Sequence, residues 1–364
     1  ITANTSWYLY NFRKNTILAL LKQGYRVIVV SPLDDYSQKL INIGATYMSI
    51  KIDSGGVNPI NDVITFYAFY KLYKQHKPSV ILNFTPKNNI YSTLAAKWAG
   101  VKVLNNIAGL GTLFINESLA SKIARVLYKY SQNQADFIFF QNEDDRKIFI
   151  DGGYTPANKT SRIPGSGINL NKFRAVEAPN DGIVRFVLVA RLLKPKGIRE
   201  DVEAAKELKR KREDVEFHLL GIPEPSSPAA IPLSQVKQWH AEGAINYLGR
   251  SDDVPSIVGN MDCVVLPSYY REGVPRSLLE AAAMAKPIIT TDNVGCRETV
   301  EHGRTGFLCH PQSVSGLATA INNVANLSHA QRVAMGEQGR LRMQRYFCVN
   351  KVIARYLEIL EEFT

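Results

Sequence analysis

The sequence predicts an α/β protein built on parallel β-sheets. Short runs of β-branched and aromatic residues alternate with longer amphipathic segments along the whole chain, as they do in repeated strand–helix–strand units. The 364 residues are 45% hydrophobic and 21% charged, which is typical of a globular protein and excludes disordered, collagen-like and coiled-coil chains. Because a single hydrophobic core stops growing at about 250–300 residues, this length favours two domains.

Four strands and four helices are expected in the first half of the chain. The strands are expected at residues 26–31, 79–84, 101–106 and 136–142, and the helices near 11–23, 59–77, 89–99 and 117–133. Only Ile1-Thr2-Ala3 precedes the polar segment Asn4-Thr5-Ser6, so the first strand is expected to be truncated.

A second series of six strands begins at Val184. These strands are expected at residues 184–191, 215–221, 244–248, 262–268, 287–291 and 306–309. Turn-forming residues between 165 and 182 separate the two series. We therefore expect an N-terminal domain over 1–170, a second domain over 171–345, and a C-terminal helix over 346–364 that packs on the first domain. Both domains have a Rossmann-like layout, so a cleft between two facing domains is the expected ligand site.

The excess of basic residues lies in the first half of the chain. Residues 1–172 carry 20 Lys and Arg against 10 Asp and Glu, whereas residues 173–364 carry 24 against 23. This asymmetry suggests contact with a nucleic acid or with an anionic membrane surface, although solubility would also explain it. No nucleic-acid-binding motif is visible and the basic residues are dispersed, so we expect no nucleic-acid partner.

The sequence also limits the compartment. No run approaches 18 apolar residues, and the first residues lack the layout of a secretory signal, so neither a spanning segment nor export is expected. The four cysteines have neither CxxC spacing nor a histidine at zinc-ligand spacing. A cytoplasmic protein with reduced cysteines is the expectation.

Two carboxylates after the strand at 262–268 are candidates for binding sugar hydroxyls. Glu272 lies in the loop, and Glu280 lies about one and a half turns into the following helix. Gly273 lets the backbone approach a ligand, and Pro275 suits the first turn of a helix whose free N–H groups favour an anion. Each ionised carboxylate can accept two hydrogen bonds from a vicinal diol. A solvated helix face is the ordinary alternative for such a Glu-x7-Glu spacing.

Two cations follow the first strand of the second series. Arg191 leaves the strand end and Lys196 closes the loop before a helix begins, so both can converge on a diphosphate. The alternative is a basic turn with solvated side chains.

Three motifs of this chain resemble glycosyltransferase family 4, the retaining enzymes of the GT-B fold, in which two Rossmann-like domains face each other across a cleft. The motifs are Arg191-x4-Lys196-Gly197, the loop Tyr247-Leu-Gly-Arg-Ser-Asp-Asp253, and Glu272-Gly-Val-Pro-x4-Glu280 followed by Lys286-Pro287. The resemblance implies that Arg191 and Lys196 bind the donor diphosphate, Glu280 the ribose and Glu272 the transferred sugar. It also implies backbone contacts to that sugar from Gly273, Val274 and Pro275, and binding of the base by Tyr247, Leu248 and Arg250.

The N-terminal half looks most like bacterial members that build surface glycans on polyprenyl diphosphate. The resemblance implies acceptor-side candidates at Trp7, Tyr8, Asn11, Arg13, Lys87, Gly109 and Gly111. Two features of the family are missing, because Asn4-Thr5-Ser6-Trp7 has no glycine and the segment 105–111 has no histidine. Contacts from this domain to the donor sugar are therefore open.

The expected reaction is transfer of a hexosyl or N-acetylhexosaminyl group from a UDP-sugar to a hydroxyl of a lipid-linked saccharide. Retention of configuration follows from the resemblance only. The chain contains no Asp-x-Asp, so neither a metal nor another cofactor is expected, and no histidine is a persuasive base. A nucleotide-sugar epimerase of the same architecture and a non-enzymatic anion-binding protein are the alternatives.

Peripheral attachment to the inner face of the cytoplasmic membrane is the last expectation. In the helix near 117–133, Leu119, Ile123, Val126, Leu127 and Tyr130 share one face, and Lys122, Arg125 and Lys129 another. Residues 66–77 place aromatics beside Lys71, Lys74 and Lys77. Packing into the core is the commoner fate of such apolar stripes, whereas the basic faces favour an anionic membrane surface.

Overall fold

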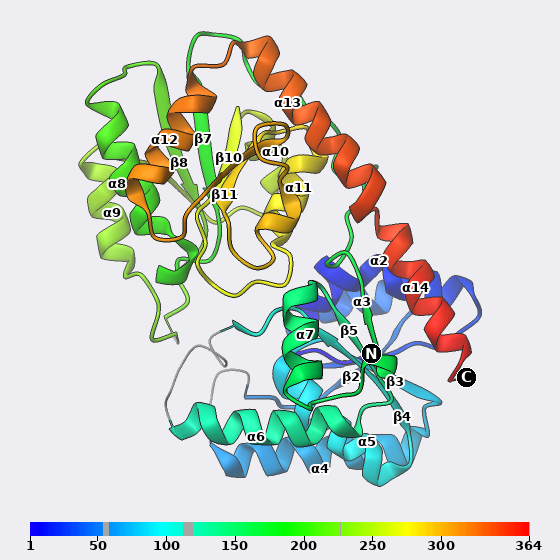
Figure 1. Ribbon diagram of the computed structural model, residues 1–364. Coiled ribbons are helices and arrows are strands. Elements are labelled where there is room, and N and C mark those ends of the chain that lie inside the picture. The colour runs from blue at the N-terminus through cyan, green and yellow to red at the C-terminus, as the bar shows by residue number, and fades with distance from the viewer. Residues whose placement is uncertain (54–57, 112–118, 226, 364) are drawn as a thin grey trace. The chain divides into compact units, whose positions relative to one another are not determined.

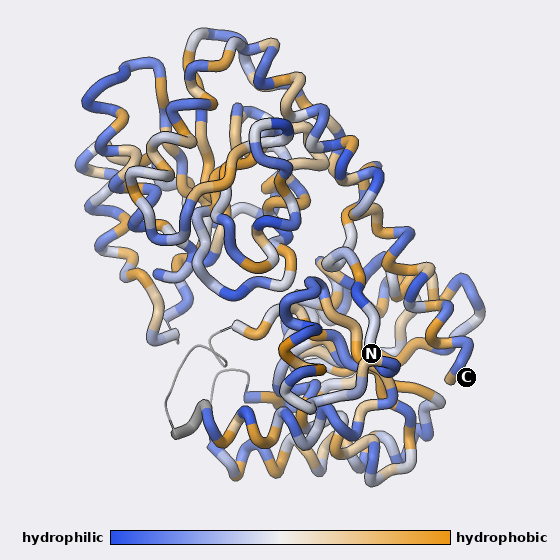
Figure 2. The backbone as a smooth tube through the Cα atoms, viewed as in Figure 1, coloured by the Kyte–Doolittle hydropathy of each residue, from blue (hydrophilic) through white to orange (hydrophobic). Residues whose placement is uncertain are grey.

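The protein forms two compact α/β units. The computed structural model describes residues 1–53, 58–111, 119–225 and 227–363, without the side chains of 119–121 (Figure 1). The first unit comprises Ile1–Ser166 and Val349–Thr364, and the second comprises Gly167–Cys348. Within each unit, apolar strands lie inside and the hydrophilic residues gather on the outer helices and loops (Figure 2). The α/β fold with parallel sheets predicted from the sequence is confirmed.

The first unit contains a parallel sheet that the N-terminal residues complete. Its strands are β1 (Ile28–Ser31), β2 (Thr46–Ser49), β3 (Val80–Asn83), β4 (Lys102–Ile107), β5 (Phe137–Phe140) and β6 (Thr160–Arg162). β1 pairs with β2, and the other four run in the order β3-β4-β5-β6. The backbone N–H of Thr2 donates to Leu82 O at 2.8 Å, and that of Ala3 donates to Val30 O at 3.2 Å. Residues 1–3 therefore lie between β1 and β3, as a first strand would.

Helices cover both faces of this sheet, and the last helix of the chain belongs to it. The helices are α1 (Ser6–Tyr8), α2 (Lys14–Lys22), α3 (Ser37–Asn42), α4 (Pro59–His76), α5 (Thr93–Ala99), α6 (Leu119–Gln134), α7 (Glu143–Asp151) and α14 (Val349–Glu361), with π-helical turns at Leu9–Arg13 and Asn88–Ser92. α14 buries Val352 and Tyr356 in the same core as Leu9 and Ile17. The Tyr356 ring meets that of Phe139 edge-on, with centroids 4.8 Å apart. The C-terminal segment is thus part of the first unit's core.

The second unit has one six-stranded parallel sheet. Its strands are β7 (Val184–Val189), β8 (Val215–Leu220), β9 (Asn246–Gly249), β10 (Cys263–Leu266), β11 (Ile288–Thr291) and β12 (Gly306–Cys309), in the order β12-β11-β10-β7-β8-β9. Around it lie α8 (Ile198–Lys209), α9 (Leu233–Ala241), α10 (Val254–Gly259), α11 (Arg276–Ala283), α12 (Val314–Ala325) and α13 (His329–Arg342). The strand order reverses between β7 and β10, because β7 connects outward to β8 while β10 connects outward to β11. Ligands of open α/β sheets bind at such a switch point, beyond the carboxyl ends of the strands.

Two edge strands, β2 and β6, were not predicted from the sequence. β2 is half-exposed along its length and β6 has only three residues, so neither shows the buried apolar run by which the inner strands were found. The six strands predicted for the second unit are all present, several of them shorter than expected.

Candidate functional site

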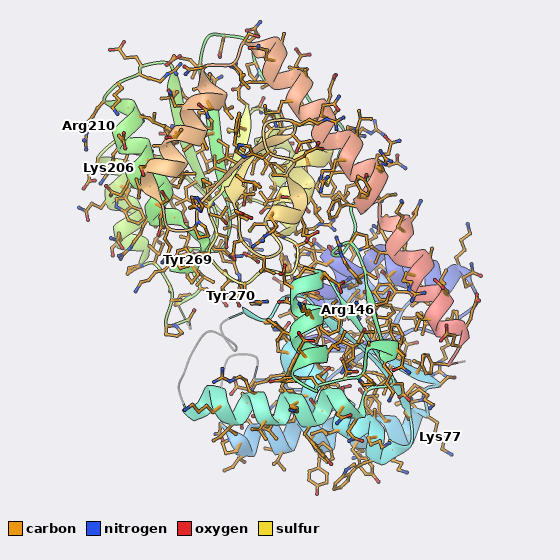
Figure 3. The ribbon with its side chains drawn as sticks, in the orientation of Figure 1. Lys77, Arg146, Lys206, Arg210, Tyr269 and Tyr270 are labelled. Atoms are coloured by element: carbon orange, nitrogen blue, oxygen red, sulfur yellow. The ribbon has the colours of Figure 1, made fainter. Side chains whose placement is uncertain are left out.

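The loops that follow β7 and β10 are joined at the switch point of the second unit. The backbone N–H groups of Tyr269 and Tyr270, both labelled in Figure 3, donate to Pro195 O at 2.9 and 3.1 Å. Gly197 ends the short 3-10 turn Lys194–Lys196 with φ +76°, and a Cβ on it would lie 2.2 Å from Pro267 O. Only glycine permits both this conformation and this approach. The two loops therefore form one rigid element.

This contact brings two of the predicted site residues together. Lys196 Nζ, from the β7 loop, forms an ion pair with Glu272 Oε1, from the β10 loop. Each side chain is only 12% exposed. Ser268 Oγ also donates to Glu272 Oε1 at 3.0 Å, and Lys196 Nζ lies 5.3 Å from the centroid of the Tyr270 ring. Glu272, the residue expected to bind the sugar, and Lys196, expected to bind the diphosphate, thus form an ion pair in the free protein.

Arg191 lies in the same loop with a different partner. Its side chain is 53% exposed, and Nη1 contacts Glu224 Oε2 at 2.5 Å. A half-exposed ion pair of this kind contributes little to stability. The guanidinium can therefore exchange Glu224 for a ligand anion at small cost.

α11 positions Glu280 through a residue that sequence reasoning missed. The helix begins at Arg276 after extended Pro275, and Arg276 Nε donates to Glu280 Oε1 at 2.9 Å. Arg276 Nη1 also donates to the carbonyl oxygen of Gly167. An i, i+4 pair on a helix is the signal that could have identified Arg276, because such residues lie one turn apart.

The loop around Gly273 packs against a second turn that contains a glycine, Gly295. Gly295 has φ +79°, and a Cβ there would lie 2.0 Å from Gly273 O. Asn293 Nδ2 donates to Tyr270 O at 2.9 Å. Gly273, Val274 and Pro275 are buried at this contact, so the backbone before α11 is fixed. The Asn293–Gly295 turn was not identified from the sequence.

The predicted base-binding segment lies at the end of β9, beyond β8 in the same sheet. The Tyr247 hydroxyl donates to Gly221 O at 2.9 Å, which ties β9 to the carboxyl end of β8. Leu248 and Arg250 are exposed, and Arg250 is 3.5 Å from Asp252.

The acceptor-side candidates of the first unit differ in accessibility. Trp7 is exposed, and Asn11 Nδ2 donates to Trp7 O at 3.0 Å. Lys87 forms an ion pair of 2.7 Å with Asp62, and the Tyr8 hydroxyl accepts a hydrogen bond of 3.0 Å from Arg13. Gly109 and Gly111 both have positive φ and form a turn after β4.

Arg13 is completely buried, with its guanidinium carbon 4.2 Å from the centroid of the Phe84 ring. It therefore packs the core of the first unit and presents no surface to a ligand.

Two further properties apply to the described parts of the chain. None of the helices there has the length and apolarity that crossing a membrane requires. No three His, Cys, Asp or Glu side chains in those ranges are grouped as metal ligands would be.

Comparison with known proteins defines the class of this site. The family described as glycosyl transferases group 1 matches residues 170–342, and the family described as glycosyl transferase 4-like matches residues 2–142. The chain is 30% identical over 331 residues to the N,N'-diacetylbacillosaminyl-diphospho-undecaprenol α-1,3-N-acetylgalactosaminyltransferase of Campylobacter jejuni, covering 86% of this chain and 85% of that enzyme. It is 27% identical over 288 residues to the UDP-Gal:α-D-GlcNAc-diphosphoundecaprenol α-1,3-galactosyltransferase of Escherichia coli, covering 74% and 72% of the two chains.

Solved structures agree on the fold. A glycosyltransferase from Rickettsia africae has a TM-score of 0.79 at 19% identity, covering 100% of this chain and 97% of that one. The structure of Anabaena HepE in complex with UDP has a TM-score of 0.77 at 18% identity, covering 99% and 98%. The protein is a glycosyltransferase of the GT-B fold class, as the sequence motifs predicted. It belongs to the family that contains the glycosyl transferase group 1 and glycosyl transferase 4-like domains.

The loop contact predicts a difference between two glycine substitutions. Gly197 and Gly243 have nearly equal positive φ, but nothing lies within 4 Å of a Cβ on Gly243. Gly243→Ala should cost about 1 kcal/mol, from the left-handed backbone alone. Gly197→Ala should cost at least about 2 kcal/mol more, because Pro267 must move. Urea unfolding of both variants measures the difference, and equal losses would contradict the locked-loop description.

Proposed function

We propose that this glycosyltransferase moves a sugar from a UDP-sugar to a hydroxyl of a saccharide carried on polyprenyl diphosphate, with retention of configuration. An N-acetylhexosamine or a related hexose is the proposed sugar, and synthesis of a bacterial surface glycan is the proposed setting. The observation that carries the donor side is the joining of Lys196 and Glu272 at the switch point of the second unit. The names of the Campylobacter and Escherichia relatives support the lipid-linked acceptor.

In this proposal, donor binding replaces internal ion pairs with ligand contacts. Lys196 leaves Glu272 for the diphosphate, and Glu272 becomes free to accept hydrogen bonds from the sugar hydroxyls. Arg191 joins Lys196 at the diphosphate, where the N-terminus of α11 also favours negative charge. Glu280 keeps Arg276 on one oxygen and accepts the ribose hydroxyls on the other. After the exchange, the sugar hydroxyls replace Lys196 at Glu272, and the partly exposed Glu224 is left to solvent.

Charge that develops on the departing diphosphate is then met by fixed groups. Arg191, Lys196 and the helix N-terminus are held by the joined loops before the reaction begins, which is the condition for electrostatic stabilisation of a transition state. The leaving phosphate oxygen takes the acceptor proton on the same face, so retention needs no separate base. We propose that the reaction requires no metal.

The two carboxylates should affect different steps. Glu280→Ala should weaken binding of UDP by about 1.5–3 kcal/mol, which is roughly 10- to 150-fold in Kd, because a charged acceptor of the ribose hydroxyls is lost. Glu272→Ala should leave UDP affinity within a few-fold and lower kcat. Isothermal calorimetry and steady-state kinetics separate the two, and unchanged UDP affinity in Glu280→Ala would contradict the ribose assignment.

The cations should affect turnover, and chelation should not. Lys196→Ala and Arg191→Ala should each lower kcat by a factor on the order of 100, because a preorganised partner of the developing charge is removed. Radiolabelled transfer assays with and without EDTA test both expectations. Loss of activity in EDTA and its recovery with manganese would overturn the metal-free reaction. An altered nucleotide sugar released without acceptor would favour an epimerase instead.

We also propose that the first unit attaches to the inner face of the cytoplasmic membrane through α6 and its neighbours. Ile123, Val126 and Tyr130 of α6 are 56%, 69% and 59% exposed, so packing into the core, the commoner fate of such a stripe, is wrong for them. The helix buries Tyr128 instead. The side chain of Leu119 lies outside the described residues. Lys122 and Lys129 are exposed on the same helix.

The helices α4 and α5 also expose aromatic and basic side chains. Tyr67 of α4 and Trp98 of α5 are both more than half exposed, and Lys71, Lys74 and Lys97 are exposed on the same two helices. The lysines of α8 in the second unit differ, because Lys206, labelled in Figure 3, contacts Glu203 and Glu242. α6 contains no acidic residue that could neutralise its lysines. Exposed aromatics beside lysines on a helix that has no acidic residue of its own suit an anionic lipid surface.

Sedimentation with vesicles tests this attachment. The protein should bind vesicles containing phosphatidylglycerol at low salt and less at high salt, because each basic residue near the surface contributes about 1 kcal/mol. The pair Lys122→Glu and Lys129→Glu should weaken binding at least tenfold. The matched pair Lys206→Glu, on α8, and Arg210→Glu, at the C-cap of that helix, should not. Equal binding to neutral and anionic vesicles, or none to either, would refute the attachment.

A further inference from the structure

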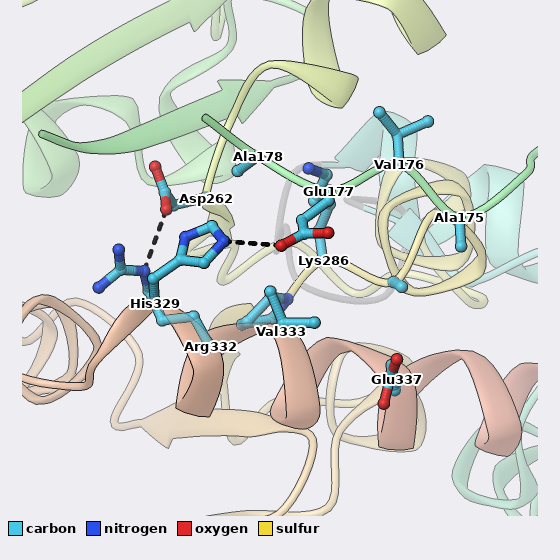
Figure 4. Close-up of a pocket in the computed structure, with 12 residues that line it drawn as sticks. Ala175, Val176, Glu177, Ala178, Asp262, Lys286, His329, Arg332, Val333 and Glu337 are labelled. Atoms are coloured by element: carbon cyan, nitrogen blue, oxygen red, sulfur yellow. Dashed lines mark hydrogen bonds and ion pairs between the residues drawn. The ribbon is translucent and has the colours of Figure 1, made fainter. Parts of the chain in front are cut away.

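A cavity lies at the amino-terminal ends of the strands in the second unit, opposite the donor loops. It has a volume of about 230 Å³ and is bounded by residues 175–178, by the residues that enter β10 and β11, and by α13 (Figure 4). Asp262 directly precedes β10, and Lys286 and Pro287 directly precede β11. The donor loops follow the carboxyl ends of β7 and β10. Because these strands are parallel, the cavity and the proposed donor site are separated by the length of the strands.

One ion pair and one histidine–carboxylate contact lie in the cavity wall. Arg332 Nε donates to Asp262 Oδ1 at 3.0 Å, and the other oxygen of Asp262 accepts the backbone N–H of Arg185 at 2.9 Å. His329 Nε2 lies 2.9 Å from Glu177 Oε1, as Figure 4 shows. Arg332 and Asp262 therefore neutralise each other, and neither is left to bind an anion.

Lys286 is different, because its buried ammonium is not neutralised. The residue is 2% exposed, and Nζ donates one hydrogen bond, to Gly259 O at 2.7 Å. In the ranges that the structure describes, no carboxylate lies within ion-pair distance of Nζ. Lysines are rarely buried without a partner, since the lost hydration must be replaced. Loss of hydration lowers the pKa of Lys286 to about 8.

A second buried donor or acceptor in the same wall is unsatisfied. His329 Nδ1 is buried and has no hydrogen-bond partner among the described residues. Val176, Ala178 and Val333 supply apolar surface beside these polar atoms. Glu177 and the exposed Glu337 also line the cavity, and they disfavour a ligand with several negative charges.

We propose that this cavity binds a small organic anion, a carboxylate or a phosphate with a short carbon skeleton, whose charge is held by Lys286. At about 230 Å³, the cavity suits a small ligand. The apolar residues would contact the carbon skeleton. The site goes beyond the proposed glycosyl transfer and does not depend on it.

Thermal unfolding of the whole chain with inorganic phosphate and with acetate tests the site. At pH 7, at least one of these anions should raise Tm saturably above a sodium chloride control of equal ionic strength. Lys286→Met and Lys286→Gln should abolish the shift, and Gln retains a donor for Gly259 O if Met impairs folding. The exposed Lys237→Met should keep the shift. An acetate shift should shrink from pH 7 to pH 9, because the Lys286 ammonium is lost as the pH rises above about 8.

A Lys196→Met variant separates this cavity from the donor loops. The rise in Tm with the anion should persist in that variant, because Lys196 lies at the carboxyl ends of the strands and the cavity at their amino-terminal ends. A shift lost in Lys196→Met but kept in Lys286→Met would place the anion at the donor loops and overturn the proposal. No anion-specific shift in the unsubstituted protein would also overturn it, and would leave Lys286 as an anchor for the Gly259 carbonyl alone.

Discussion

The close approach of the β7 and β10 loops is the constraint on which the rest of the candidate site depends. Gly197 lies against the Pro267 carbonyl, and the Pro195 carbonyl accepts two backbone N–H groups from the facing loop. The reversal of strand order places these loops side by side, and the left-handed glycine lets them touch. Lys196 and Glu272 are 76 residues apart in the chain, and this contact alone makes them partners. A preorganised site needs such a rigid support, because charges stabilise a transition state only where they are already in place.

The ion pairs of the free site explain how it can carry so much charge at half-buried positions. Lys196 pairs with Glu272, Arg276 with Glu280, and Arg191 with Glu224. At the two mostly buried pairs, Lys196–Glu272 and Arg276–Glu280, an unpaired charge would be costly, whereas the half-exposed Arg191–Glu224 pair contributes little. The pairs also set the order of events in the proposed reaction, since a ligand anion competes with Glu272 for Lys196. Arg276 has a further contact, to Gly167 O, at the residue where the second unit begins. The position of Glu280 is thereby coupled to the chain segment that joins the two units.

Local pattern was enough to predict the inner strands and the site motifs, and it failed where tertiary contacts decide. The buried runs of β7, β8 and β10 are apolar and bounded by turn residues, so they could be recognised. The edge strand β2 is half-exposed and lacks that signature. Arg13 is charged, so its sequence predicts a surface position, yet the neighbouring Tyr8 and the distant Phe84 and Tyr356 surround it. The apolar stripe of α6 reads as a core face, but Tyr128, which lies outside that stripe, fills the interior. Which face a helix buries depends on the elements packed against it, and a single sequence does not show which elements those are.

The two units also differ in their balance of basic and acidic residues. In the second unit the numbers of basic and acidic residues nearly balance, and on α8 and α11 lysine and arginine contact glutamate on the same helix. The first unit carries 21 basic against 13 acidic residues, and the charged residues of α6 are all basic. Solubility would be served equally well by charge of either sign, spread over both units. The larger excess, in the first unit, includes helices that also expose aromatic and branched apolar side chains, which supports the proposed contact with a partner that is both anionic and apolar. A lipid surface has both properties, and the proposed attachment would hold the first unit, the proposed acceptor-binding unit, where a lipid-linked saccharide is found.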